Sequence, residues 1–204
     1  MKLTFKKGYN GDVNTLPSRE VEGAVAFREP ETIGKFALVA NAASVVILIL
    51  AAIPLIIVFL SQPKASLGSS DFYFTLIIGL VLSVIVTPVH ELLHAVCFRE
   101  EVEFYTALKL GLLFVIGTES MSKARFVFMS MLPNLVFGFI PYILYFVIPA
   151  HPLWLGVFGA ACLCSGAGDY INVFHAVTQM PKGAKCYMSK NRSYWYLDNS
   201  GKNL

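Results

Sequence analysis

The apolar residues of this chain gather into four long stretches that are separated by short polar segments. These stretches cover residues 36–60, 72–98, 126–148 and 153–177. An α-helix needs about 20 mostly apolar residues to cross a bilayer, so the pattern predicts four transmembrane helices. Pro54 interrupts the first stretch, and membrane helices tolerate such a proline with a kink.

Polar segments flank the four stretches on both sides. Residues 1–35 carry mixed charge, and residues 179–204 are polar and basic. We expect a cytosolic N-terminal segment and a cytosolic C-terminal tail around one four-helix domain over residues 36–178. The first 35 residues contain neither an early apolar core nor a small-residue cleavage site, so we expect no secretory signal peptide.

The segment between the second and third stretches is unusual for a loop. Residues 103–114 are rich in aromatic and aliphatic side chains but are too short to cross a bilayer, and residues 117–120 then turn the chain back. This pattern predicts a hydrophobic hairpin or a re-entrant segment, with an amphipathic interfacial helix as the alternative. The predicted fold class is therefore an all-α membrane protein with four transmembrane helices and this segment between helices two and three.

Composition supports membrane insertion and excludes nucleic acid as a partner. The 204 residues are 56% hydrophobic and 14% charged, with a mean hydropathy of +0.64, whereas soluble domains carry about 25% charged residues. The net charge is only +3 and the basic residues are scattered, so no basic patch suited to nucleic acid is present in the sequence. The lipid bilayer is the expected environment of an integral, multi-pass protein.

Lysine and arginine residues set the expected orientation in the membrane. They are frequent in residues 1–35, in the loop after the second stretch and in the C-terminal tail, whereas the two other loops hold Lys64 alone. Cytoplasmic loops carry the excess of positive charge. Four spans with both termini in the cytosol satisfy this rule.

The second stretch carries a motif that is typical of a metal site. His90-Glu91-Leu92-Leu93-His94 follows the pattern H-E-x-x-H. On a helix the two histidines share one face and can bind one Zn²⁺, while Glu91, about 100° round the helix, can act as a base toward water at the metal. Such groups are expensive in hydrocarbon and by default mark a functional site. The alternative is a pair of buried histidines that are satisfied by backbone carbonyl groups.

A catalytic zinc needs a third protein ligand, and Asp169 is the best candidate. It is the only carboxylate in the third or fourth stretch, and it lies about 12 Å from the cytosolic end of its helix, as His90 does. The alternatives are an intramembrane aspartate paired with a basic residue, and His175 as the third ligand instead.

Asn134 is a candidate for contact with the substrate. It follows Pro133 and lies about 12 Å into the third stretch, and its amide could donate to the oxyanion or to the peptide carbonyl group. An asparagine that joins two helices is the alternative.

With these residues the chain resembles a family of bacterial membrane proteins of unknown function described as "putative zincin peptidase", and more remotely the site-2 proteases. The resemblance covers most of residues 70–178, through the H-E-x-x-H motif, the hydrophobic loop, Pro133-Asn134 and Gly168-Asp169. The resemblance implies that residues 36–178 form a zincin-like domain and that the protein lies in a bacterial cell membrane.

In site-2 proteases two histidines and a distant aspartate bind zinc, and the motif glutamate activates water. The resemblance therefore implies that His90, His94 and Asp169 bind one zinc ion and that Glu91 is catalytic. The site-2 aspartate usually precedes a glycine, whereas Asp169 follows one.

The expected function is that of a zinc metallopeptidase, a hydrolase that cuts a membrane protein or peptide at or just inside the cytosolic membrane face. The first alternative is a non-hydrolytic zinc-binding membrane protein that acts as an assembly factor or regulator, although pure binding has no use for Glu91. The second is a transporter with an intramembrane ion site, for which four spans are few. The sequence indicates neither the substrate nor the oligomeric state.

Overall fold

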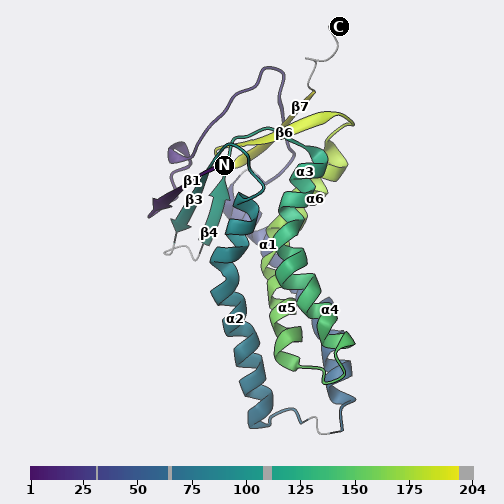
Figure 1. Ribbon diagram of the computed structural model, residues 1–204. Helices are drawn as coiled ribbons and strands as arrows, with labels where there is room; N and C mark the ends of the chain where they lie inside the picture. Colours follow the sequence, from purple (N-terminus) through teal and green to yellow (C-terminus); the bar gives the residue numbers. More distant parts are fainter. Residues whose placement is uncertain (31, 64–65, 108–111, 198–204) are drawn as a thin grey trace. The chain divides into compact units, whose positions relative to one another are not determined.

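A computed structural model of the protein describes residues 1–30, 32–63, 66–107 and 112–197 (Figure 1). The chain forms two compact units. The first unit comprises residues 1–31, 91–131 and 171–204, and the second comprises residues 32–90 and 132–170.

The chain forms long apolar helices and short strands. The elements are β1 (Lys2–Lys7), the 3₁₀ turn η1 (Val13–Thr15), β2 (Val25–Ala26), α1 (Ile33–Leu60), α2 (Ser70–Ala95), β3 (Glu101–Ala107), β4 (Leu112–Ile116), β5 (Met121–Ser122), α3 (Lys123–Pro133), the π-helix η3 (Asn134–Phe139), α4 (Ile140–Val147), α5 (Leu153–Ser165), α6 (Ala167–Gln179), β6 (Ala184–Ser189) and β7 (Arg192–Leu197).

The second unit is built from apolar helices. Helix α5 packs against α1, α4 and η3, and small residues let the backbones approach closely. The hydroxyl groups of Tyr142 and Tyr145 donate to the carbonyl groups of Ala51 and Leu55. These carbonyl groups lie on either side of Pro54, where the helix lacks one N–H donor.

The first unit contains two sheets. In one, β1 pairs in parallel with β3, which pairs antiparallel with β4; in the other the strand order is β2-β7-β6-β5. A buried apolar cluster fills this unit between its strands and helix ends. Its members are Phe27, Ala95, Phe98, Val102, Met121, Phe126, Met129, Ala176, Met180, Ala184 and Cys186.

The predicted all-α fold class is wrong, because both terminal segments contribute strands. Residues 2–7 pair with residues 101–106, almost 100 positions along the chain, and such a pairing leaves no local periodicity in a short lysine-rich segment. The β6–β7 hairpin turns at Lys190, whose φ is +54°. The usual Asn-Gly or Asp-Gly signal of a two-residue hairpin turn is missing there.

The hairpin predicted after the second stretch is present, but residues 117–120, where the sequence placed the turn, follow β4 and do not join the two strands. Strands β3 and β4 pair with Tyr105 opposite Phe114, and their rings stack at 5.1 Å between centroids. Residues 108–111, which lie between the two strands in the sequence, are outside the described residues.

Among the described residues, three helical segments are long and apolar enough to cross a membrane, at residues 34–60, 70–95 and 123–147. A fourth span would be α5 and α6 together, which meet at a bend of 51°. Many large apolar side chains on these helices are exposed, among them Leu38 and Val84 at 71% each. Such surfaces suit lipid rather than water.

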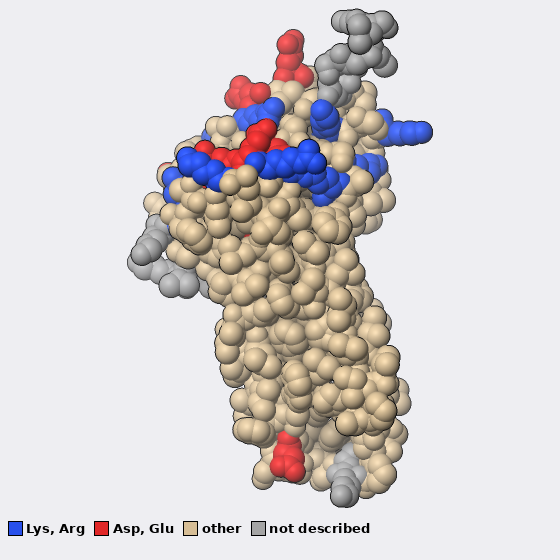
Figure 2. All heavy atoms as spheres, in the orientation of Figure 1, with Lys and Arg blue, Asp and Glu red and all other residues tan. Residues whose placement is uncertain are grey.

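Charged residues are concentrated in the first unit (Figure 2). The sequence of the second unit contains only Lys35, Lys64, Asp71 and Asp169. Of these four, Asp169 is the one carboxylate in residues 132–170, and it lies in the first turn of α6.

Candidate metal centre

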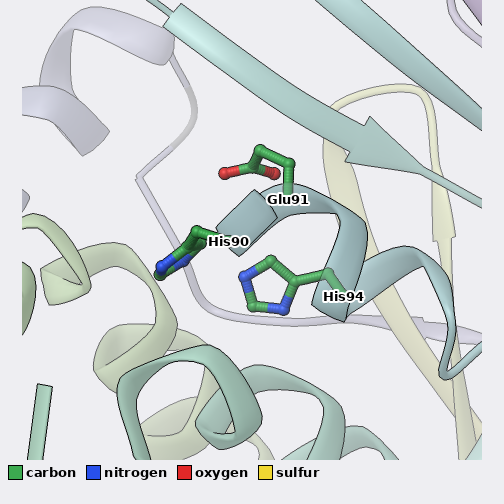
Figure 3. Close-up of side chains that lie close together, drawn as sticks. All are labelled: His90, Glu91 and His94. Atoms are coloured by element: carbon green, nitrogen blue, oxygen red, sulfur yellow. The ribbon is translucent and has the colours of Figure 1, made fainter. Parts of the chain in front are cut away.

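Helix α2 carries, close to its C-terminal end, three side chains that could hold a metal ion. His90, Glu91 and His94 each offer one ligand atom, and these atoms lie within 4.8 Å of one another. The helix continues through Pro88 without a break, so the four-residue spacing places both imidazole rings on one side (Figure 3). The side chain of Glu91 leaves the helix on the other side from His94 in this view.

The ring of His94 is held by a backbone group. His94 is 7% exposed, and its Nδ1 lies 2.9 Å from the carbonyl oxygen of Met129 on α3. A carbonyl oxygen only accepts hydrogen bonds, so Nδ1 carries a proton and donates it to Met129. Metal-ligating histidines are commonly oriented in this way.

The ring of His90 faces a carboxylate. Its Nε2 lies 3.3 Å from Oδ2 of Asp169, and the two side chains are 12% and 15% exposed. The Nδ2 group of Asn134 donates to the same oxygen at 2.7 Å. Three residues that the sequence singled out for chemistry, from α2, η3 and α6, therefore meet in the second unit.

A helix break sets the position of Asp169. Helix α5 ends at Ser165, Gly166 caps it, and α6 begins at Ala167. Asp169 therefore lies in the first turn of α6, and not within one continuous span as the sequence pattern suggested. The positive end of a helix dipole favours a carboxylate at this position.

The donor set fits a zinc ion. Two histidines and a carboxylate form one of the ligand sets of a catalytic zinc, and within the second unit Nε2 of His90 lies 3.3 Å from Oδ2 of Asp169.

Arg125 fixes the chain just beyond the motif. Its Nε and Nη2 groups donate to the carbonyl oxygen of Cys97 at 3.1 and 2.6 Å, and its Nη1 group pairs with Glu119. The other oxygen of Glu119 accepts the backbone N–H groups of Arg99 and Glu100. Burial of Glu119 opposes its ionisation, but the hydrogen bonds from Arg125 and from the two backbone groups outweigh burial and hold its pKa below the ordinary value.

His175, the alternative third ligand, bonds within its own helix. Its Nδ1 accepts a hydrogen bond from Nε2 of Gln179 at 2.7 Å, and Gln179 in turn binds the backbone of Arg28. His175 is thus part of the contact between the N-terminal segment and α6.

Sequence reasoning missed three contributors to the site. The Met129 carbonyl has no sequence signal, because a backbone oxygen is present at every residue. Arg125 is one of several basic residues in the loop after the second stretch, and its charge does not reveal its partners. Gly166 lies in a run of small residues before Asp169, and nothing local in the sequence indicates which side chain approaches it.

Comparison with known proteins gives a family match. A family model described as "putative zincin peptidase" matches residues 83–185, just over half of the chain, and the matched range contains all five candidate site residues. No curated protein and no solved structure matches the chain significantly.

Proposed function

The chain belongs to the family described as "putative zincin peptidase", and from this premise we propose that it is a membrane-embedded zinc metallopeptidase. The bond that it hydrolyses lies at or just inside the cytosolic face of the membrane. The observation that carries this proposal is the close grouping of the ligand atoms of His90, Glu91 and His94 on an apolar helix. The family description supports a metallopeptidase in general, and the apolar helices support membrane embedding.

His90, His94 and Asp169 would hold one zinc ion. The hydrogen bond from His94 to the Met129 carbonyl supports this role, because metal-ligating histidines commonly donate their other ring N–H to a backbone carbonyl. The contact of Asp169 with His90 supports Asp169 as the third ligand. When bound, zinc supplies Lewis-acid chemistry, which polarises the scissile carbonyl group and makes water a stronger nucleophile near neutral pH.

Glu91 would act as general base and general acid. Its carboxylate takes a proton from the attacking water and delivers that proton to the nitrogen of the leaving amine. Glu91 is partly buried, and its ligand atom lies within 4.8 Å of those of His90 and His94. This position supports the role, because a base must lie within reach of the reacting water.

The substrate would be a membrane protein or peptide that is bound in extended form. A transmembrane helix hides its backbone in internal hydrogen bonds, so it must unwind before cleavage. In the described part of the sheet, β1 and β4 are the edge strands. Lys2 and Lys6 on β1 form ion pairs with β3, and edge lysines oppose strand pairing. Strand β4 has no charged residue, so it is the edge at which an extended peptide could add as a strand.

The decisive experiment replaces the proposed base. Glu91→Gln in the full-length protein should abolish cleavage of a membrane peptide that the wild type cuts, while the zinc content stays near one ion per chain. Glu22→Gln, at an exposed position of the N-terminal segment, is the matched control and should cleave normally. Cleavage by Glu91→Gln at the wild-type rate would refute the mechanism. Zinc-loaded wild type that cuts no membrane peptide would instead favour a non-hydrolytic zinc protein.

A further inference from the structure

Asn134 is buried against the carboxylate of Asp169. Its side chain is 0% exposed, and Nδ2 donates to Oδ2 of Asp169 at 2.7 Å. That oxygen is the one that lies 3.3 Å from Nε2 of His90. A fully buried amide presents no surface to a substrate, whereas it directly contacts the oxygen that faces the histidine.

The backbone at Asn134 departs from a regular α-helix. Helix α3 ends at Pro133, and Asn134 is the first residue of the π-helix η3. Short π-helical segments inside helices occur frequently at functional sites. Here the change of helix type occurs at the residue whose side chain binds Asp169.

Gly166 makes the space that the amide of Asn134 occupies. A Cβ atom on Gly166 would lie 1.6 Å from Oδ1 and 2.5 Å from Cγ of Asn134. Both distances are far shorter than a van der Waals contact. The backbone of Gly166 has φ −77° and ψ 9°, a conformation that other residues adopt. A Cβ atom at this position would therefore displace the amide of Asn134, so glycine serves here for space and not for backbone freedom.

Gly168 provides an internal comparison. A Cβ atom there would meet nothing closer than the ring of Phe36 at 3.6 Å, which is an ordinary contact. The two glycines before Asp169 thus differ, although they look equivalent in the sequence.

We propose that Asn134 and Gly166 act together as positioning residues for Asp169. Gly166 admits the amide of Asn134, and the amide holds the carboxylate oxygen toward His90. The inference rests on the proposed function, in which Asp169 is a zinc ligand, and it gives Asn134 a role in holding that ligand instead of contacting the substrate.

The test measures the zinc dissociation constant of full-length protein in detergent against a competing chelator. Asn134→Ala and Gly166→Ala should each weaken zinc binding about 10–100-fold, as the loss of a partner that orients a metal ligand commonly does. Gly168→Ala should bind zinc like the wild type. Asn134→Leu, which keeps the branched shape of the side chain without the donor, should match Asn134→Ala and guards against a folding defect caused by a cavity.

A double variant separates a joint role from two independent defects. In Asn134→Ala/Gly166→Ala the added methyl group no longer meets the amide, so its zinc affinity should equal that of Asn134→Ala alone. The unfolding temperature of each chelator-treated protein records structural damage separately from zinc binding. The proposal is overturned if the losses of zinc affinity in the two single variants multiply in the double variant. It is also overturned if Gly166→Ala binds zinc with wild-type affinity.

Asp169→Ala distinguishes this inference from the function on which it rests. If Asp169→Ala keeps wild-type zinc affinity, the proposed ligand set is refuted. If Asp169→Ala loses zinc but both Asn134 variants keep it, only the positioning role is refuted.

Discussion

Both motif histidines are oriented by groups that the motif does not contain. The Met129 carbonyl holds the ring of His94, and Asp169 faces the ring of His90. A ligand that is already oriented loses less conformational freedom when it binds, so these contacts favour a preorganised site.

Histidine substitutions test the ligand assignment at the residue scale. His94→Ala should reduce bound zinc from one ion to nearly none, because it removes one of three ligands. His175→Ala should retain zinc, because the Nδ1 atom of His175 already accepts a bond from Gln179. Metal analysis of both variants from parallel preparations measures this, and loss of zinc in His175→Ala alone would identify a different ligand.

At the scale of elements, Arg125 joins the end of α2 to the start of α3 within the first unit. It binds the Cys97 carbonyl after α2 and pairs with Glu119 before α3. One helical turn beyond Arg125, Met129 binds His94. Arg125 thus holds the end of α2 beside α3, one helical turn from the contact that orients His94, a proposed zinc ligand.

The Glu119 pair predicts a pH dependence of stability. Because its pKa in the folded protein is lowered, the carboxylate stabilises the fold above its ordinary pKa of about 4.3, and this contribution is lost as the pH falls through the lower folded value. Glu119→Gln should lower the free energy of unfolding by about 2 kcal/mol at pH 7, and the difference from the wild type should shrink in acid. Denaturation in detergent at several pH values measures both.

Glu101→Gln is the control for this experiment. Its ion pair with Lys2 involves side chains that are 54% and 76% exposed, and exposed pairs contribute little. Equal losses in the two variants at pH 7 would contradict the role given to Glu119.

Close helix packing in the second unit gives another prediction. A Cβ atom on Gly159 would lie 2.5 Å from the backbone nitrogen of Tyr142 and 2.8 Å from the carbonyl oxygen of Gly138. Backbone atoms cannot move aside as a side chain can, so Gly159→Ala should lower the free energy of unfolding by about 1–3 kcal/mol. Gly34→Ala, with nothing within 4 Å, should not destabilise the protein. Equal unfolding temperatures for the two variants in detergent would contradict the packing argument.

At the scale of the whole molecule, the number of spans decides on which sides of the membrane the termini lie. Three helical segments satisfy the criteria for a span, and the bent pair α5–α6 would make a fourth. Four spans place both termini on one side, and three place them on opposite sides.

We predict that both termini are cytosolic, because lysine and arginine gather in both terminal segments. Reporters fused to each end should both give a cytosolic signal, and a reporter in residues 61–69 should not. An N-terminal and a C-terminal reporter on opposite sides would show that α5 and α6 do not together cross the membrane.

The sequence alone determined the features that depend on neighbouring residues. Apolar runs of spanning length located the long helices, an aromatic and aliphatic segment too short to span located the β3–β4 hairpin, and a five-residue motif placed His90, Glu91 and His94 together. These patterns suffice because helix and hairpin geometry repeat over a few residues.

Only the tertiary structure decided what depends on residues far apart in the chain. The pairing of β1 with β3 joins segments almost 100 positions apart, and it overturned the all-α class. The break at Gly166 and the approach of Asn134 to Asp169 depend on the packing of three helices. A carboxylate in an apolar stretch shows that a partner is needed, but its identity follows from which helices pack side by side, and local periodicity does not encode that choice.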